Sequence, residues 1–343
     1  MPPENDQVVP PAPRIRVEPD RNRQDLWNQV LRPADPPQWN FQANDIQQAG
    51  PMRELDIFVD EPPALASLKK NVATKTTSNK MGDIYGVKLH PKAAKAAASH
   101  PDEIIKGIEL EIENFPVSLE EADATGFNFV VDGSLRNNGI EAVSNPNNTK
   151  GLLVTTEALW EKYNIKENNF SDRTSIHVHA NVWDFSSEAF KSLTLYYQVF
   201  EELLFDFVSN DRANNIFCVP WYEAGITALN HRRMIEKPRD WQKYTALNLH
   251  PVVSQGTVEF RHMHGHANLE MLTAWLAIID DLMLTSKKSD YNVVVNTIND
   301  LNTNSQYYNF LTTTFPNSWK FLMSDRWEHK LSRGVVEAKY SMV

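Results

Sequence analysis

The sequence predicts an α+β fold built on a mostly antiparallel sheet, and two observations carry this prediction. The strand-like segments alternate apolar and polar residues, which is typical of antiparallel strands with only one face covered. Strands and helices also follow one another irregularly along the chain, without the strict strand–helix alternation of parallel sheets. The chain has 343 residues, of which 41% are apolar and 23% charged, and this is enough for a large domain with a packed core.

The predicted elements lie between residues 104 and 285. Strands are expected at 104–115, 127–131, 139–143, 174–183, 244–249 and 257–262. Helices are expected at 155–163, after Ser186 and after Asn268, because serine and asparagine are good N-caps and apolar residues recur at three- and four-residue spacing after both caps. Residues 286–343 are expected to be mostly helical or irregular.

The composition of residues 1–52 differs from that of the remaining chain. This segment holds ten of the 20 prolines, and proline fixes φ and lacks a backbone donor. We therefore expect an extended or disordered proline-rich arm, in which Trp27, Leu31 and Trp39 offer apolar contacts to a partner protein. Residues 53–343 are expected to form a single domain, with its core at about 103–285 and a mostly helical extension at 286–343.

Composition and charge exclude several classes of protein. Asp and Glu number 44 against 34 Lys and Arg, and the net charge of −10 argues against a nucleic-acid-binding protein. The sequence has no long uncharged apolar run that would predict a membrane span, and its first residues do not resemble a secretory signal. Cys218 is the single cysteine, so an intrachain disulfide and a multi-cysteine zinc site are excluded. A cytoplasmic location is expected.

Side chains that carry chemistry share one face on each of three predicted strands, because side chains alternate across a strand. These residues are Glu109, Glu111 and Glu113 on the first strand, His177 and His179 on the second, and Glu259 and Arg261 on the third. The opposite face of each strand is apolar and is predicted to pack against helices. The other side of the sheet would then present acids, histidines and an arginine together.

This combination of residue types predicts phosphoryl transfer at a divalent metal. Clustered carboxylates repel one another unless a cation lies among them, and oxygen ligands with one imidazole suit Mg²⁺ or Mn²⁺. The planar donors of arginine match phosphate oxygens. The P-loop and the glycine-rich dinucleotide motif are absent, as is the serine nucleophile motif, so a nucleotide would bind through another architecture.

The ordered motifs resemble the amidoligase family, part of the carboxylate–amine ligase superfamily that includes glutamine synthetase and glutamate–cysteine ligase. The resemblance covers about 103–285. It rests on Gly107-Ile108-Glu109-Leu110-Glu111, on Asp132-Gly133-Ser134-Leu135 with Gly139-Ile140-Glu141, on Ile176-His177-Val178-His179, on Asn248, and on Gly256-Thr257-Val258-Glu259-Phe260-Arg261. It implies a curved sheet whose concave face holds ATP and two or more Mg²⁺ or Mn²⁺ ions. It also implies a ligase that joins a small-molecule or peptide carboxylate to an amine through an acyl phosphate.

The resemblance also implies a role for each matching residue. Glu109, His177 and Glu259 would hold one metal ion, and Glu111 and Glu141 another. His179, Asn248, Ser134 and Arg261 would bind the nucleotide; Arg261 and Glu259 would act in catalysis, together with Arg212 on a substrate carboxylate. The sequence departs from the family after Arg261, where a histidine-rich stretch at 262–266 replaces the usual Gly-Thr and leaves the substrate open.

Two other interpretations stay open at this point. His177, His179 and one carboxylate are also the ligands of a mononuclear metal oxygenase or hydrolase. Such enzymes usually carry the acid a few residues after the histidine pair, whereas Glu188 is nine residues beyond His179 and opens a helix. The other interpretation is a non-catalytic binding or structural protein of the same fold, attached to an assembly through residues 1–52.

Overall fold

A computed structural model describes residues 80–224 and 241–342, all within the unit Arg53–Val343. The arm predicted at 1–52 lies outside the described residues. In the part of the chain that is described, no helix is both long and apolar enough to cross a membrane.

Six strands form one open sheet in the order β2-β3-β1-β4-β6-β5, and every neighbouring pair is antiparallel. The strands are β1 (Lys106–Ile112), β2 (Phe127–Val130), β3 (Ile140–Ser144), β4 (Ser175–Asn181), β5 (Leu247–Asn248) and β6 (Thr257–His264). The predicted α+β class is confirmed. The strand expected at 244–249 is shorter than predicted, because Thr245 pairs in parallel with Val219 instead of extending β5.

Helices of the described residues precede, separate and follow the strands. They are α4 (Met81–Tyr85), α5 (Pro91–Ser99), α6 (Thr149–Tyr163), α7 (Ser187–Val208), α9 (Leu269–Lys288), α10 (Tyr291–Asp300), α11 (Asn304–Thr314), α12 (Trp319–Leu322) and α13 (Trp327–Ser341). Ser186 and Asn268 cap α7 and α9 as predicted. Helix α6 begins six residues before the predicted Thr155, because Asn148 accepts a hydrogen bond from the Gly151 amide at 2.9 Å.

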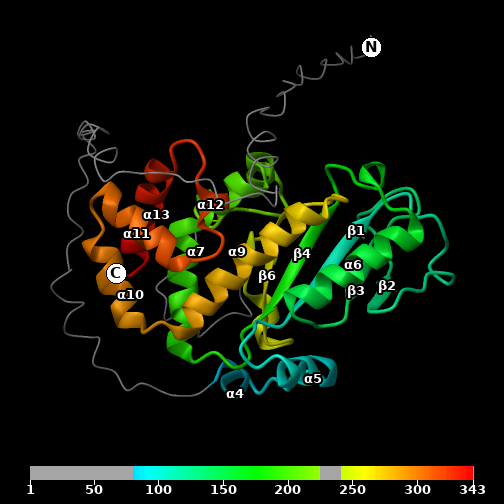
Figure 1. Cartoon of the computed structure of the whole chain (residues 1–343), viewed down its shortest axis with the longest axis horizontal. Coiled ribbons are helices and arrows are strands. Elements are labelled where there is room, and N and C mark those ends of the chain that lie inside the picture. The colour runs from blue at the N-terminus through cyan, green and yellow to red at the C-terminus, as the bar shows by residue number, and fades with distance from the viewer. Residues whose placement is uncertain (1–79, 225–240, 343) are drawn as a thin grey trace, which may run out of the picture. The chain divides into compact units, whose positions relative to one another are not determined.

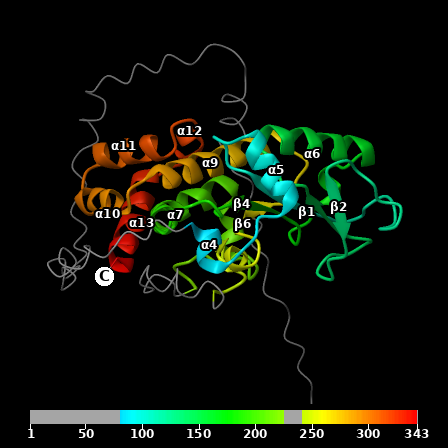
Figure 2. The same ribbon diagram turned by 90° about the horizontal axis from the view of Figure 1, so that it is seen from below.

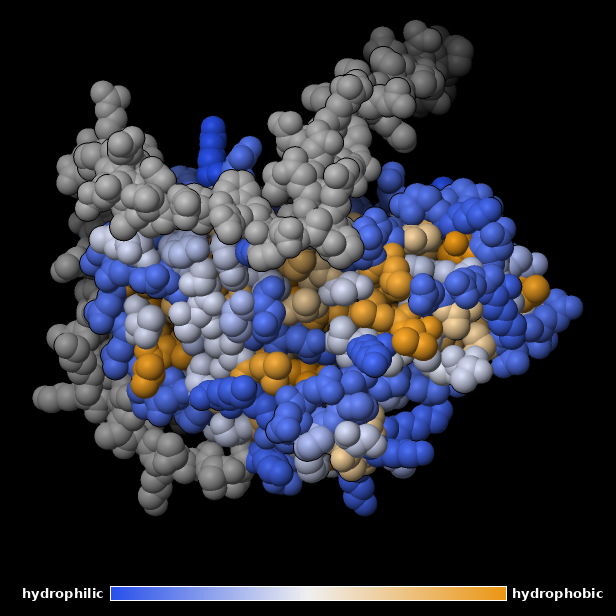
Figure 3. All heavy atoms as spheres, viewed as in Figure 1, coloured by the Kyte–Doolittle hydropathy of each residue, from blue (hydrophilic) through white to orange (hydrophobic). Residues whose placement is uncertain are grey.

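Helices α6, α7 and α9 cover one face of the sheet (Figures 1 and 2). Ile108, Val178 and Phe260, one from each central strand, have no exposed surface on this face. Burying a side chain of this size contributes about 1.5–3 kcal/mol. The outer side of this helical layer is mostly hydrophilic, with smaller apolar areas (Figure 3). The sheet is therefore anchored from one side, and its polar side chains face the other.

The C-terminal helices pack against the helical layer. Helix α13 lies across α7, where a Cβ added to Gly334 would come within 2.0 Å of the Val199 carbonyl oxygen. Only glycine allows this approach of the two backbones. Helices α10–α13 occupy most of the predicted extension at 286–343 and pack against α7 and α9.

Candidate active site

Cross-strand pairing brings the polar residues of separate strands together. The register places Glu109 opposite His177, Glu111 opposite Glu141, and His179 opposite Glu259. Side chains directly opposite each other on one face lie about 4.5–5.5 Å apart at Cβ. Residues 150 positions apart in the chain therefore form one polar surface on β3, β1, β4 and β6.

A β-bulge in β6 lies at Arg261 and His262. Arg261 and His262 both lie opposite His177, because the register shifts between Ile176 and Val178. An extra residue of this kind bends the strand and redirects its side chains. Arg261 stays on the polar face, whereas His262 is fully buried among aromatic rings of the helical layer. The histidine-rich stretch thus does not continue the site residue by residue.

Glu109, His177 and Glu259 form a group of ligand atoms that all lie within 4.8 Å of one another. Nδ1 of His177 is 3.3 Å from Oε2 of Glu109 and 3.4 Å from Oε1 of Glu259. Adjacent ligands around an octahedral ion with bonds of about 2.1 Å are about 3 Å apart, so the spacing fits a divalent cation. These are the three residues that the resemblance assigned to one metal ion.

Ser175 fixes the orientation of His177. The Ser175 hydroxyl donates to Oε2 of Glu111 at 2.7 Å, so its oxygen is left to accept the Nε2 proton of His177 at 2.8 Å. Nδ1 of His177 faces the two carboxylates and lies within hydrogen-bond distance of Oε2 of Glu109, at the position where a metal ion would bind. Metal-binding histidines are usually held in this way through their other ring nitrogen. The Glu111–Ser175–His177 chain therefore prepares Nδ1 as a ligand.

His179 also contacts the Glu109 carboxylate. Its Nε2 is buried and is 3.1 Å from Oε1 of Glu109, at an angle that makes no hydrogen bond, while Nδ1 is 3.1 Å from the Thr257 hydroxyl. Burial opposes the charged ring, but the Glu109 and Glu259 carboxylates raise the pKa of His179. His179 therefore adds a second imidazole beside the Glu109 carboxylate.

Glu111 and Glu141 form a second acidic pair beside the first group. Oε2 of Glu111 accepts hydrogen bonds from the amide and hydroxyl of Ser175 at 2.8 Å and 2.7 Å. Burial, reinforced by the charges of Glu109 and Glu111, raises the pKa of Glu141 to about 8. A cation between these carboxylates would favour the ionised form of Glu141.

The carboxyls of Glu109 and Glu259 are ionised in spite of their burial. Burial alone would raise the pKa of Glu109, but contacts with His177 and His179 hold it well below its usual value. The pKa of Glu259 is also lowered against the effect of burial, by the charges of His179, His177 and Arg261. Both groups are therefore available as anionic ligands at neutral pH.

Arg261 is held rigidly at the edge of the cluster. Its Nη1 donates to Oε1 of Glu259, and its Nε donates to the Phe217 carbonyl oxygen at 2.9 Å. The guanidinium also lies 5.8 Å from the centroid of the Tyr244 ring, which packs edge-on against the Phe217 ring. Salt bridge, carbonyl and ring together fix a planar cation beside the metal-ligand group.

The other predicted residues occupy different positions around the cluster. Asn248 joins it, since its side-chain amide donates to Oε2 of Glu259 at 2.7 Å. The described contacts of Ser134 run to Asp132 and Arg173 in a turn, and none of them reaches the carboxylates. Arg212 is buried behind β6, where its guanidinium binds backbone carbonyl groups.

Sequence reasoning missed four residues that shape the site. Ser175 and Thr257 contact the two histidines, and the same alternation that placed His177 on the polar face would have found both. Phe217 and Tyr244 hold Arg261 from segments outside the sheet. Their positions depend on tertiary packing, and no local pattern marks them.

The fold and the site together define an α+β protein with a carboxylate–histidine group able to hold a metal ion. Residues 92–283 match the sequence profile of a family described as "Putative amidoligase enzyme". The match covers more than half of the chain, and the chain therefore belongs to this amidoligase family, named for enzymes that form amide bonds. No curated protein sequence matches the chain.

Proposed function

We propose that this protein is an ATP-dependent ligase that joins a carboxylate to an amine. The observation that carries the proposal is the Glu109–His177–Glu259 group with Arg261 fixed at its edge. Family membership supports amide-bond formation, and the ligand group supports use of a divalent metal.

The reaction needs activation of the acid, because a carboxylate has no leaving group that an amine can displace. In the proposed reaction a carboxylate oxygen attacks the γ-phosphorus of ATP, which forms an acyl phosphate and releases ADP. The amine nitrogen then attacks the acyl carbon, phosphate leaves, and the nitrogen loses a proton. A bound Mg²⁺ or Mn²⁺ would neutralise negative charge on the phosphates during the transfer.

In the proposal, each residue of the cluster either binds a metal ion or stabilises the transferred phosphoryl group. Glu109, His177 and Glu259 hold one ion, while Glu111 and Glu141 hold a second. Arg261 stabilises charge on the transferred phosphoryl group, since its guanidinium is preorganised beside the first ion site. The nucleotide-binding roles of His179, Asn248 and Ser134 remain proposals taken from the resemblance.

The substrates in this proposal are a small-molecule or peptide carboxylate and an amine, with a partner protein engaged through residues 1–52. The alternative mononuclear oxygenase or hydrolase is less well supported, because the tightest group of ligand atoms in the described residues contains two carboxylates and one histidine rather than two histidines. The intact acidic cluster also favours an enzyme over a purely structural protein.

The test is release of ADP from ATP with pooled amino acids, peptides and polyamines as carboxylates and amines. We expect release that requires Mg²⁺ or Mn²⁺ and both organic substrates, with the amide product detected by mass spectrometry. Metal-independent release, or tightly bound iron or zinc in the purified protein, would contradict the proposal.

Replacing Ser175 with alanine should weaken Mn²⁺ binding about tenfold, because the Nε2 proton of His177 loses its acceptor and the ring loses its orientation. Calorimetric titration measures the change. Threonine keeps the hydroxyl, so Ser175→Thr should recover most of the affinity. Equal affinities for the alanine variant and the wild type would show that His177 needs no such support.

A further inference from the structure

Arg212 contacts the backbone of β6 at the bulge formed by Arg261 and His262. It belongs to the 3₁₀ turn η2 (Asn210–Asn214) and is only 1% exposed. Its Nε donates to the His262 carbonyl oxygen at 3.1 Å, and its Nη2 donates to the Arg261 carbonyl oxygen at 2.8 Å. Arg261 and His262 both lie opposite His177, and the Arg212 guanidinium binds the carbonyl oxygens of both.

The bulge needs such a partner. An extra residue disrupts the ladder of hydrogen bonds locally, and a buried carbonyl oxygen without a donor is destabilising. The Arg261 amide also donates to the Ala246 carbonyl oxygen at 2.8 Å. The backbone of Arg261 is therefore held by two hydrogen bonds, one to Ala246 through its amide and one from Arg212 to its carbonyl oxygen.

The chain makes a strained turn to bring Arg212 to this place. Ser209, directly after α7, has φ 106°, in a region that residues other than glycine rarely adopt. The Arg212 amide donates to the Ser209 carbonyl oxygen at 3.2 Å and closes the turn. Strain of this kind persists where the surrounding contacts impose it, and it often occurs beside functional sites.

We propose that Arg212 is a positioning residue, which holds the two bulge carbonyls and thereby fixes Arg261 beside the metal-ligand group. This differs from the role in binding a substrate carboxylate that the family resemblance implied. Nε and Nη2 of Arg212 are already committed to the protein backbone, and the side chain is enclosed. The inference rests on the proposed function in one respect, which is the contact of Arg261 with phosphate.

A double-mutant cycle separates the two roles. Calorimetry would measure the affinity for a non-hydrolysable ATP analogue with Mn²⁺ in the wild type, Arg212→Met, Arg261→Met and the double variant. We expect Arg212→Met to weaken binding about tenfold or more, and the double variant to bind no more weakly than Arg261→Met alone. Arg212→Lys, which keeps one donor group, should lose less. Arg333→Met, at a side chain 57% exposed on α13, is the control and should bind normally.

The outcomes that overturn the inference are specific. Wild-type affinity in Arg212→Met, or losses that add fully in the double variant, would show that Arg212 does not act through Arg261. If Arg212→Met does not fold, the same cycle with Arg212→Lys gives the answer.

Failure of the proposed function would give a different result, namely a wild-type protein that binds no nucleotide. The crystal structure of the Arg212 variant then decides the inference. Arg261 displaced from Glu259 and from the Phe217 carbonyl supports it, and Arg261 in its original place overturns it.

Discussion

Replacing Glu109 with glutamine will weaken Mn²⁺ binding by at least about 100-fold, because even residues that only support a metal ligand contribute 10–100-fold to affinity. Glu109 is the carboxylate shared by both histidines, at 3.3 Å from Nδ1 of His177 and 3.1 Å from Nε2 of His179. Glutamine keeps the size and one oxygen but removes the charge that the cation needs. Isothermal titration with Mn²⁺, in the absence of nucleotide, measures the effect.

Glu113, which directly follows β1, provides a matched control. Its carboxylate is also buried, but it accepts a hydrogen bond from the Arg136 amide at 3.0 Å and lies outside the ligand group. Glu113→Gln should therefore bind Mn²⁺ as the wild type does. If Glu109→Gln and Glu113→Gln lose the same affinity, the effect is one of general charge and the assignment of Glu109 is wrong.

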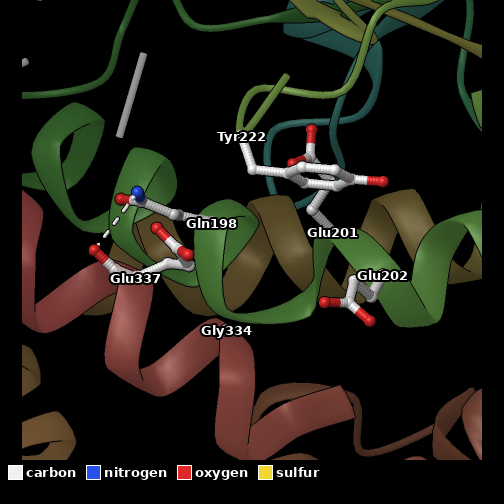
Figure 4. A pocket seen from close by; sticks show the side chains of 6 residues that line it. All are labelled: Gln198, Glu201, Glu202, Tyr222, Gly334 and Glu337. Carbon is white, nitrogen blue, oxygen red and sulfur yellow. Dashed lines mark hydrogen bonds between the residues drawn. The ribbon is translucent and has the colours of Figure 1, made fainter. Parts of the chain in front are cut away.

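Replacing Glu201 with glutamine will remove a steep pH dependence of the stability. Glu201 lies on α7 and is 3% exposed, and its Oε1 accepts hydrogen bonds from the Tyr197 hydroxyl at 2.7 Å and the Trp221 amide at 2.8 Å. Figure 4 shows its carboxylate beside the Tyr222 ring, at a small cavity between α7 and α13. Burial outweighs these hydrogen bonds and raises the pKa of Glu201 from 4.5 to about 8.

The sign of the effect follows from proton binding. Between pH 4.5 and about 8 the folded state keeps a proton on Glu201 that the unfolded state has already released. The stabilisation is complete below pH 4.5 and is lost as the pH rises through this window, at up to about 1.4 kcal/mol per pH unit. Glutamine has no such proton, so the stability of Glu201→Gln relative to the wild type will increase with pH.

Urea unfolding of both proteins across this pH window measures the two slopes. Glu188→Gln is the control on the same helix, because Glu188 lies in the first turn and its side chain is 28% exposed. That variant should keep the wild-type slope. Parallel curves for Glu201→Gln and the wild type would show that Glu201 is ionised in the folded protein.

Alternation of polarity made the sheet predictable from the sequence. It identified the polar faces of β1, β4 and β6, because a strand has a period of two and covered antiparallel strands are apolar on one side only. It also placed Glu109, His177 and Glu259 on facing strands, although they are far apart in the chain. The motif order indicated the amidoligase family, and residues 92–283 match that family.

The register was beyond sequence reasoning, because it depends on the bulge. A single extra residue in β6 places Met263 opposite Ile176, and no pattern in the histidine-rich stretch marks this break. The support of Arg261 was missed for a similar reason. Phe217 and Tyr244 come from irregular segments, and their contacts form only when the whole chain is packed.

The central claim is that Glu109, His177 and Glu259 together bind one divalent ion at the polar face of the sheet. Crystals soaked with Mn²⁺ and a non-hydrolysable ATP analogue, with anomalous data at the manganese edge, test it directly. We expect a manganese peak bonded to an oxygen of each glutamate and to Nδ1 of His177, with a phosphate of the analogue beside Arg261. Manganese bound elsewhere, with these three side chains left free, would contradict it.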